Sequence, residues 1–162
     1  MFRELRRCKQ LLSSEEIRTV LLRCTNGVLA CIGDNGYPYA VPLSYVYFNK
    51  KIYFHSAKAG HKIESIVRDP RISFAVIDED AIVSEEFTSY FRSVIAFGKS
   101  RIVEGQERIE ALRALVEKYS GDQPQEIKEK NINGCTQSHV VSIDIEYLTG
   151  KQAKKLVKNI VQ

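Results

Sequence analysis

The sequence has no apolar run that approaches the roughly 20 residues a helix needs to span a membrane. Its first seven residues, Met-Phe-Arg-Glu-Leu-Arg-Arg, place charges where a secretory signal requires an apolar segment, so no signal peptide is expected. The four cysteines include no Cys-x-x-Cys pair, which argues against a zinc ribbon or a thioredoxin-like motif. We therefore expect a cytoplasmic protein without a membrane partner, whose cysteines are free thiols.

Several common catalytic motifs are also missing. The chain has no Gly-x-x-x-x-Gly-Lys-Ser/Thr loop for nucleoside triphosphates and no Gly-x-Gly-x-x-Gly fingerprint for dinucleotides. No Gly-x-Ser-x-Gly elbow nominates a serine nucleophile. The three histidines, His55, His61 and His139, lack the close spacing of a zinc motif, so no metal is expected.

Charge is modest in sum and uneven along the chain. The net charge is +4 over 162 residues, with basic stretches at residues 1–10 and 151–162 and acidic residues gathered in an expected loop at 78–86. A nucleic-acid-binding protein more often concentrates its basic residues on one face among aromatic residues. We therefore interpret the basic ends as solvated flanks and expect no nucleic-acid partner.

Four segments are expected outside the strands. Ser13 and Glu16 have capping-box spacing, and apolar residues at helical spacing follow, so a helix is predicted over residues 14–23. A short helix is predicted around residues 63–67 and a second amphipathic helix around 109–119. Residues 120–138 are polar and are expected to form a loop.

The remaining segments predict six strands joined mostly by tight turns, at about residues 27–32, 37–48, 52–57, 72–77, 88–103 and 140–145. Such short connections allow only antiparallel pairing. Pro38 and Pro42 imply that the second strand has a bulge, is an edge strand, or faces a ligand. Gly98 is a candidate bulge in the fifth strand. These features favour a mainly β fold with flanking helices, a small closed or split antiparallel barrel; an open sheet with helices on one face is the alternative.

No repeat or linker divides the chain, so one domain is expected over residues 1–162. Within it we place the helix at 14–23, the barrel at about 27–147 and a basic tail at 150–162.

A possible anion site follows the third strand, where the sequence reads His-Ser-Ala-Lys-Ala-Gly-His-Lys over residues 55–62. The start of a helix offers unpaired amide hydrogens and a partial positive charge, and acidic residues usually occupy its first turn. His61 and Lys62 stand there instead, which favours a phosphate ligand. The alternative is that both side chains point into solvent.

The fifth strand contains a second unusual feature. Alternation places Arg92 with Val94, Ala96 and Gly98 on one face, so a charge interrupts an apolar stripe. An arginine in such a position lies more often at a rim or an interface than in a core. The alternative is an ion pair with Glu85 or Glu86.

Two sequence motifs resemble those of a known superfamily. Residues 37–45, Tyr-Pro-Tyr-Ala-Val-Pro-Leu-Ser-Tyr, are followed by Ile-Tyr-Phe-His-Ser-Ala at 52–57 and Gly-His-Lys at 60–62. The second motif is Tyr-Phe-Arg-Ser-Val-Ile-Ala-Phe-Gly-Lys at 90–99. Together they resemble the pyridoxamine-phosphate-oxidase-like, FMN-binding split-barrel superfamily, in particular its nitroimidazole-resistance (Nim-type) branch.

The resemblance implies a six-stranded antiparallel split β-barrel of the FMN-binding type. It also implies a homodimer with one flavin in each of two clefts at the subunit interface. By position, Ser56, Ala57, Gly60, His61 and Lys62 would hold the phosphate. Val41, Pro42, Leu43 and Ser44 would lie along the flavin ring. Tyr90, Arg92 and Ser93 would reach the flavin, from the partner subunit if the clefts are shared. His55 would lie on the substrate side as the catalytic residue.

The implied function is a flavin-dependent oxidoreductase acting on a small molecule, with a nitroimidazole or nitroaromatic compound as one acceptor. FMN is the expected cofactor and FAD the alternative. A non-catalytic flavin- or haem-binding carrier or sensor is the second hypothesis. True pyridoxamine-phosphate oxidases grip their substrate with further C-terminal arginine and histidine residues, whereas this chain continues Gly-Lys-Gln-Ala-Lys-Lys at 150–155. That particular activity is therefore not expected.

Overall fold

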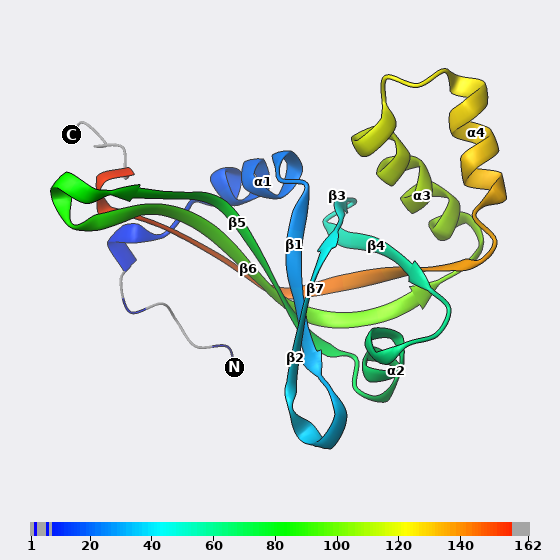
Figure 1. Cartoon of the computed structure of the whole chain (residues 1–162), viewed down its shortest axis with the longest axis horizontal. Helices are drawn as coiled ribbons and strands as arrows, with labels where there is room; N and C mark the ends of the chain where they lie inside the picture. Colours follow the sequence, from blue (N-terminus) through cyan, green and yellow to red (C-terminus); the bar gives the residue numbers. More distant parts are fainter. Residues whose placement is uncertain (1, 3–5, 7, 157–162) are drawn as a thin grey trace.

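The computed structural model describes Phe2, Arg6 and residues 8–156. Its helices are α1 (Ser14–Arg23), α2 (His61–Arg68), α3 (Gly105–Ser120) and α4 (Gln125–Gly134). Its strands are β1 (Asn26–Ile32), β2 (Pro38–Ser44), β3 (Val46–Phe48), β4 (Lys51–Ala57), β5 (Arg71–Val83), β6 (Thr88–Val103) and β7 (Ser138–Gln152). Figure 1 shows the strands crossing at the centre, with α3 and α4 on one side and the paired ends of β5 and β6 projecting as an arm on the other.

All seven strands belong to one antiparallel sheet with the order β2-β1-β5-β6-β7-β4-β3. The two edge strands, β2 and β3, are consecutive in the chain and are separated by Tyr45 alone. The sheet must therefore curl until its edges meet at this residue, yet no ladder of hydrogen bonds joins β2 to β3 in the described residues. The result is a split barrel: it is mainly β with flanking helices, as expected, and the sheet is not closed.

The strand count differs from the six expected because the predicted strand at 37–48 is interrupted. Tyr45 is fully buried, and its hydroxyl donates a hydrogen bond to the carbonyl of Leu21 at 2.9 Å. Its backbone N–H donates to the hydroxyl of Tyr119 at 2.9 Å. These contacts with α1 and α3 replace strand pairing at Tyr45, so the chain leaves one edge of the sheet and joins the other.

Three segments that were predicted to lie outside the regular elements belong, at least in part, to strands or helices. Residues 78–83 belong to β5 rather than to an acidic loop, because Glu79 to Val83 pair with β6 through the arm and Asp78 lies at a register shift just before them. The stretch 120–138 contains α4, which packs on α3. The last strand continues to Gln152, so Gly150 and Lys151 belong to β7 rather than to a tail. Residues 157–162 of the expected tail lie outside the described residues.

Other local predictions are confirmed. The helix α1 covers residues 14–23, and both hydrogen bonds of the Ser13–Glu16 capping box form. The fifth predicted strand is β6, with the expected boundaries and a register shift against β7 between Phe97 and Gly98. The strand that contains Pro38 and Pro42 is an edge strand, where the missing amide hydrogens interrupt no second ladder.

The apolar residues form two clusters that set the positions of the helices. The larger fills the barrel and the surfaces under α1 and α2, with Phe54 and Phe74 fully buried. The smaller lies outside the barrel between β4, β7 and the α3–α4 hairpin, around Tyr53 and Leu112. Since side chains alternate along a strand, neighbouring residues of β4 contact different clusters. The described helices include none that is both long and apolar enough to cross a membrane.

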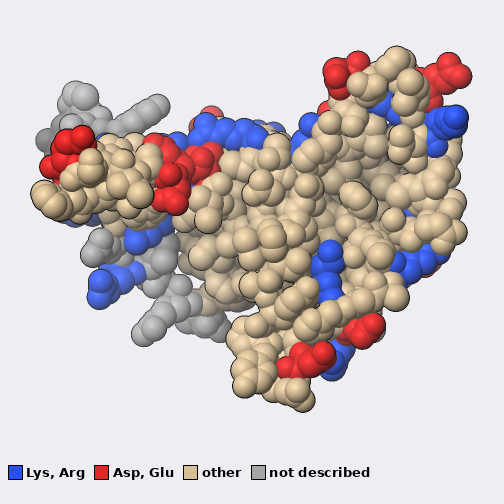
Figure 2. All heavy atoms as spheres, viewed as in Figure 1, with Lys and Arg blue, Asp and Glu red and all other residues tan. Residues whose placement is uncertain are grey.

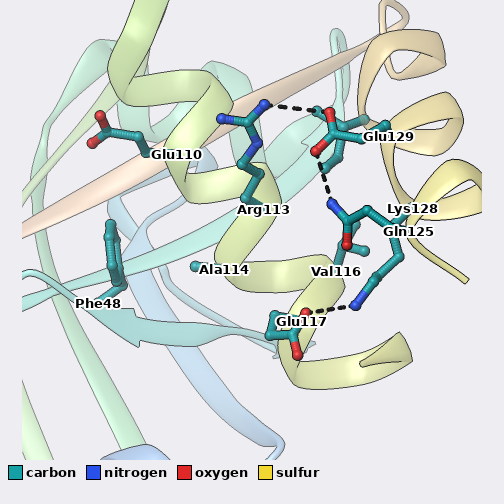
Figure 3. A pocket seen from close by; sticks show the side chains of 10 residues that line it. Phe48, Glu110, Arg113, Ala114, Val116, Glu117, Gln125, Lys128 and Glu129 are labelled. Carbon is teal, nitrogen blue, oxygen red and sulfur yellow. Dashed lines mark hydrogen bonds and ion pairs between the residues drawn. The ribbon is translucent and has the colours of Figure 1, made fainter. Parts of the chain in front are cut away.

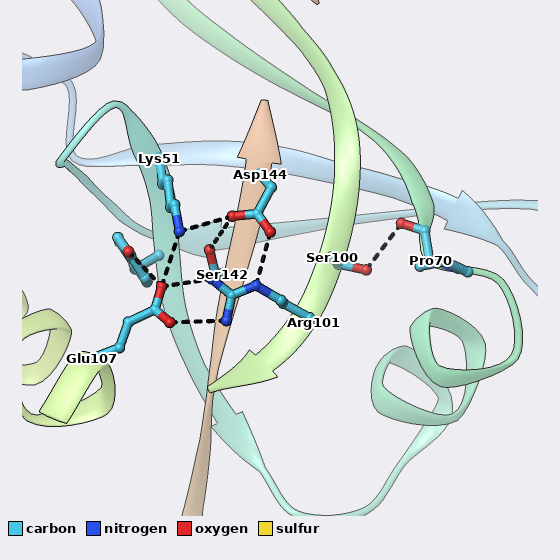
Figure 4. A network of polar contacts seen from close by, with 8 residues as sticks. Lys51, Pro70, Ser100, Arg101, Glu107, Ser142 and Asp144 are labelled. Atoms are coloured by element: carbon cyan, nitrogen blue, oxygen red, sulfur yellow. Dashed lines mark hydrogen bonds and ion pairs between the residues drawn. The ribbon is translucent and has the colours of Figure 1, made fainter. Parts of the chain in front are cut away.

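A network of charged side chains fixes α3 to the outside of the barrel (Figure 4). Glu107 of α3 accepts two hydrogen bonds from Arg101, at 2.7 and 2.8 Å, and one from the Tyr53 hydroxyl at 3.0 Å. Lys51 lies 3.2 Å from Glu107 and 3.1 Å from Asp144. The contact with Arg101 is the largest cause that lowers the pKa of Glu107, from 4.5 to about 2.

We expect Glu107 to contribute to the acid sensitivity of the fold. Because its pKa is lowered in the folded state, its stabilising effect is present above pH 4.5 and is lost as the pH falls toward about 2. The Glu107→Gln variant should therefore lose less stability than the wild type over this range. Urea unfolding midpoints measured across the range test this, and parallel pH profiles for the two proteins would contradict it.

Candidate functional site

The candidate site begins at the split of the barrel. The strand β2 pairs only with β1, and residues 54–57 of β4 pair only with β7, because β3 reaches no further than Tyr53. Since β2 and β3 follow one line interrupted at Tyr45, the unpaired edges of β2 and β4 face the same gap. Backbone groups along both edges are therefore free to bind a ligand placed in the split.

Lys62 lies in the first turn of α2, which begins directly after the loop that leaves β4. Its side chain is half-buried, with Nζ 5.5 Å from the centre of the Phe54 ring. It forms no ion pair with any residue that the structure describes. Burial lowers the pKa of Lys62, which shows that the charged form lacks compensation in the protein alone. An anion at this position would supply that compensation.

The neighbouring His61 is held differently. Its ring stacks on Tyr39 with 4.1 Å between ring centres, and its Nε2 lies 3.5 Å from a carboxylate oxygen of Asp34. The first turn of α2 also contains an acid that the sequence analysis overlooked, since Glu64 accepts a hydrogen bond from the Gly60 N–H at 3.3 Å. Of the two basic side chains in this turn, Lys62 alone therefore lacks an acidic partner among the described residues.

Ser44 and His55 line one cavity of about 270 Å³ between the barrel and the α3–α4 hairpin. Both side chains are exposed, and His55 makes no hydrogen bond with a described residue. The wall is mostly apolar, with several polar groups around it. The other lining residues are Leu112, Leu115, Val116, Tyr119, Ser120, Asn131, Ile132 and Cys135. A mostly apolar cavity with a few polar groups has the composition of a small-molecule pocket.

The remaining predicted residues of β2 and β4 alternate between two surfaces. Val41 and Leu43 pack against the barrel core, whereas Pro42 and Ser44 are exposed on the opposite face. A ligand on one face of β2 would therefore contact only alternate side chains of this segment. In β4, Ser56 is half-buried opposite His139, and Ala57 is exposed opposite Ser138.

The three predicted residues of β6 lie apart from these groups. The Tyr90 hydroxyl donates to Glu86 at 2.9 Å, near the end of the arm. Arg92 lies 3.2 Å from Asp78 and 3.6 Å from Glu79, so the alternative of an ion pair with an acid is confirmed, but the acids are not Glu85 or Glu86. The partners differ because β5 continues beside β6, which puts Glu79 directly opposite Arg92.

Asp78 is the centre of that cluster. It also pairs with Arg23 of α1 and accepts a hydrogen bond from the Cys24 thiol at 3.3 Å. Burial by itself would raise the pKa of Asp78, but the hydrogen bonds from Arg23 and its neighbours hold this pKa below its ordinary value. The positive charge of Arg92 is therefore already balanced by acidic residues of the same chain. Ser93 lies on the outer face of the sheet, opposite Ile77 and Lys151.

Sequence reasoning missed the wall of the cavity formed by α3 and α4. The apolar spacing of α3 was visible, but α4 carries only two isoleucines in a polar sequence, Gln-Glu-Ile-Lys-Glu-Lys-Asn-Ile-Asn-Gly. It packs because Ile132 is buried in the smaller apolar cluster, and Figure 3 shows the ion pairs that also join the two helices, Arg113 with Glu129 at 3.3 Å and Lys128 with Glu117 at 2.9 Å. These four side chains line a surface hollow of about 520 Å³ between α3 and α4. The hollow is therefore a place where the two helices are joined by ion pairs.

No cluster of three or more His, Cys, Asp or Glu side chains suitable for a metal ion occurs in the described part of the chain.

Most of the predicted site residues fall into three groups. Lys62 and its neighbours lie at the start of α2, Ser44 and His55 share a cavity, and Tyr90, Arg92 and Ser93 lie along β6.

Solved structures of other proteins have a fold similar to that of this chain. No curated protein matches the chain. A solved conserved hypothetical protein from Mycobacterium tuberculosis is 24% identical, with a TM-score of 0.81 over 98% of this chain and 96% of that one. A putative 5-nitroimidazole antibiotic resistance protein from Bacteroides thetaiotaomicron is 23% identical, with a TM-score of 0.73 over 88% and 86% of the two chains. An FAD-binding protein from Mesorhizobium loti is 25% identical, with a TM-score of 0.61 over 89% and 97%.

The family comparison covers the barrel, the start of α2 and the cavity beneath the α3–α4 hairpin. The model of the family described as pyridoxamine 5'-phosphate oxidase matches residues 13–152, from the cap of α1 to the end of β7. With that match over most of its length, the chain belongs to the pyridoxamine 5'-phosphate oxidase family.

Proposed function

We propose that this chain binds a flavin across the split of the barrel, with the flavin phosphate at the start of α2. The observation that carries the proposal is Lys62, a half-buried cation without an acidic partner in the described residues. The Ser56 hydroxyl and the backbone after β4 lie in the same segment and offer further donors to a phosphate. The similarity to a protein described as FAD-binding supports a flavin as the anionic ligand.

FMN is the form we propose, because the donors gathered at α2 suit a terminal phosphate. The exposed face of β2 with Pro42 and Ser44 would then lie beside the ring. When bound, the flavin supplies hydride or electron transfer. The chain's own contribution is to bind the phosphate and to orient the ring at the split.

The cavity beside His55 is the proposed substrate site. Its volume of about 270 Å³ is slightly below the range of about 300–1,000 Å³ typical of pockets for drug-sized ligands, so a small ring compound suits it. His55 and Asn131 offer hydrogen bonds to such a compound, and the imidazole has a proton to give to a reduced acceptor. Nitroimidazoles and nitroaromatics combine this size with polar acceptor atoms.

A homodimer is part of the proposal, since the outer face of the sheet carries an apolar surface that the described residues cover only in part, where Phe2 packs on Phe97 and Tyr147. The pairing of β2, β1, β5, β6 and β7 places Pro42, Val28, Ala75, Ile95 and Thr149 in one row across this face. Ala30, Ser73, Phe97 and Tyr147 form the row on one side of it, and the exposed Ile77 lies in the row on the other side, opposite Ser93. Figure 2 shows a broad uncharged region over the middle of the molecule, with acidic side chains gathered on the arm.

We expect Ile95→Ser to weaken dimer formation by about tenfold, because it removes apolar contact from the centre of this face. Ile95 is 38% exposed in the single chain, so the change should have little effect on folding. Sedimentation equilibrium over a dilution series measures the effect. Ile127→Ser on α4 is the matched control, since Ile127 is also exposed but lies on another surface. A monomeric wild type would contradict the proposed dimer.

The proposed function is tested by the visible absorption spectrum of the purified protein, before and after FMN is added. We expect the bands of a bound oxidised flavin, their loss when NADH or NADPH is supplied, and their return when a nitroimidazole is added. Tight binding without this cycle would favour the carrier hypothesis over an oxidoreductase. No binding of FMN or FAD would contradict both.

A further inference from the structure

Another cavity lies between α1 and the turn that joins β3 to β4. Its volume is about 800 Å³, within the range of ligand pockets. It contains none of the residues assigned to the flavin or to its substrate. The lining residues are Ser14, Ile17, Arg18, Leu22, Tyr47, Phe48, Asn49, Lys50, Ile145 and Leu148. We refer to this cavity as the α1 groove.

The floor of the α1 groove is apolar and continues into the barrel. Tyr47, Ile145 and Leu148 are partly buried against the main core, and Ile17 belongs to that core. Leu22, at one side of the groove, is nevertheless 46% exposed. An apolar body lying in the groove would therefore remove exposed hydrocarbon from water without displacing any polar contact of the floor.

Two cations, Arg18 and Lys50, stand in the wall of the α1 groove, and its lining includes no acidic residue. Neither cation forms an ion pair with a residue in the described part of the chain. Lys50 is held in place by a turn in which Asn49 and Lys50 both have left-handed backbone conformations, with φ of 48° and 61°. In Figure 2, basic side chains follow the α1 side of the molecule between the arm and α3.

The two acidic residues of α1 do not line the α1 groove. Glu16 accepts the hydrogen bond from the Ser13 backbone at 2.7 Å in the capping box. Glu15 lines a different hollow, together with Arg23 and Arg92. The α1 groove therefore combines an apolar floor with an uncompensated positive charge, which is the complement of a molecule with an apolar body and one anionic end.

We propose that the α1 groove binds an amphiphilic anion, a molecule with an aliphatic or aryl body and a carboxylate. The body lies against Leu22, Tyr47 and Leu148, and the carboxylate is held by Arg18 and Lys50. Arginine suits this role because its planar guanidinium matches a carboxylate with two parallel hydrogen bonds. The proposed anion site does not include the flavin, so this proposal is independent of the proposed redox function.

Isothermal titration calorimetry with decanoate tests the proposal, with decyltrimethylammonium as a ligand of the same chain length and opposite charge. We expect decanoate to bind at one site per chain and the cationic analogue to bind at least tenfold more weakly. The double variant Arg18→Gln, Lys50→Gln should weaken decanoate binding by about tenfold, because it removes both charge-assisted contacts. Leu22→Ser, at a half-exposed position that folding tolerates, should also weaken binding.

The matched control is Lys9→Gln with Lys130→Gln, which lowers the net charge by the same amount at exposed positions outside the groove. It should bind decanoate as the wild type does, and saturation with FMN should leave the affinity unchanged. The proposal is overturned if decanoate does not bind, if the two double variants behave alike, or if FMN competes with decanoate. Failure of FMN binding alone would overturn the flavin proposal and leave the α1 groove intact.

Discussion

Lys62→Ala should weaken FMN binding by about tenfold to a hundredfold, because a charge-assisted phosphate contact contributes about 1.5–3 kcal/mol. The half-buried ammonium already bears the desolvation that an ion pair requires, and the described residues offer it no acidic partner. Binding the phosphate therefore gains a contact without breaking one. Titration of the apoprotein with FMN, followed by flavin fluorescence, measures the change.

The same variant should fold normally. Among the described residues, the ammonium contacts the face of the Phe54 ring, with Nζ 5.5 Å from the ring centre, and this interaction contributes about 0.5–1 kcal/mol. Lys58→Ala is the matched control, since Lys58 lies in the loop just before α2 and is exposed. It should leave the FMN affinity nearly unchanged. If Lys62→Ala binds FMN as tightly as the wild type while both variants remain folded, the phosphate does not lie at the start of α2.

Local rules account for the parts of the fold that the sequence predicts well. The capping box begins α1 at the expected residue because Ser13 and Glu16 satisfy the first amide groups of the helix by themselves. The limits of β6 follow from a stretch rich in β-branched and aromatic residues, with Arg92 and Gly98 among them, between Phe87, at the tip of the arm, and Glu104 before α3. The edge position of β2 follows from its two prolines, which tolerate only one ladder.

Other features depend on contacts between distant segments. The break at Tyr45 arises because its backbone and hydroxyl bond to Tyr119 and Leu21, and no neighbouring residue indicates either partner. The strand β5 extends into an acidic segment that reads as a loop, because pairing with β6 outweighs the weak strand propensity of Asp78, Glu79 and Asp80. The helix α4 is held by ion pairs to α3, which hydrophobic periodicity cannot detect.

The candidate site also has a part that local sequence predicts and a part that depends on contacts between distant segments. The segment from His55 to Lys62 could be nominated from its sequence, because a strand end, a glycine and the start of a helix are contiguous there. The cavity beside His55 could not, since its opposite wall comes from α3 and α4, more than 50 residues further along the chain. The partner of Arg92 was also misassigned, because strand register determines which acid lies opposite it.

Gly98→Ala should strongly destabilise the sheet. A Cβ at this position would lie 2.2 Å from the carbonyl oxygen of Asp144 and 3.0 Å from its carbonyl carbon, both in the backbone of β7. The contact occurs where the β6–β7 register shifts, so β7 must move to relieve it. We expect a loss of about 3 kcal/mol, the upper end for overpacking, and a fall in Tm of roughly 10 °C in a thermal unfolding experiment.

The displacement of β7 should also reach the network around α3. Asp144 bonds to Arg101 at 2.8 Å and pairs with Lys51, so a shift of its backbone strains the contacts that fix Glu107. Gly134→Ala is the matched control, because a Cβ there meets no atom within 4 Å and lies at the end of a helix, where alanine is favoured over glycine. Its stability should be unchanged or slightly higher. Equal stability of the two variants would mean that β6 and β7 separate more easily than their close approach at Gly98 implies.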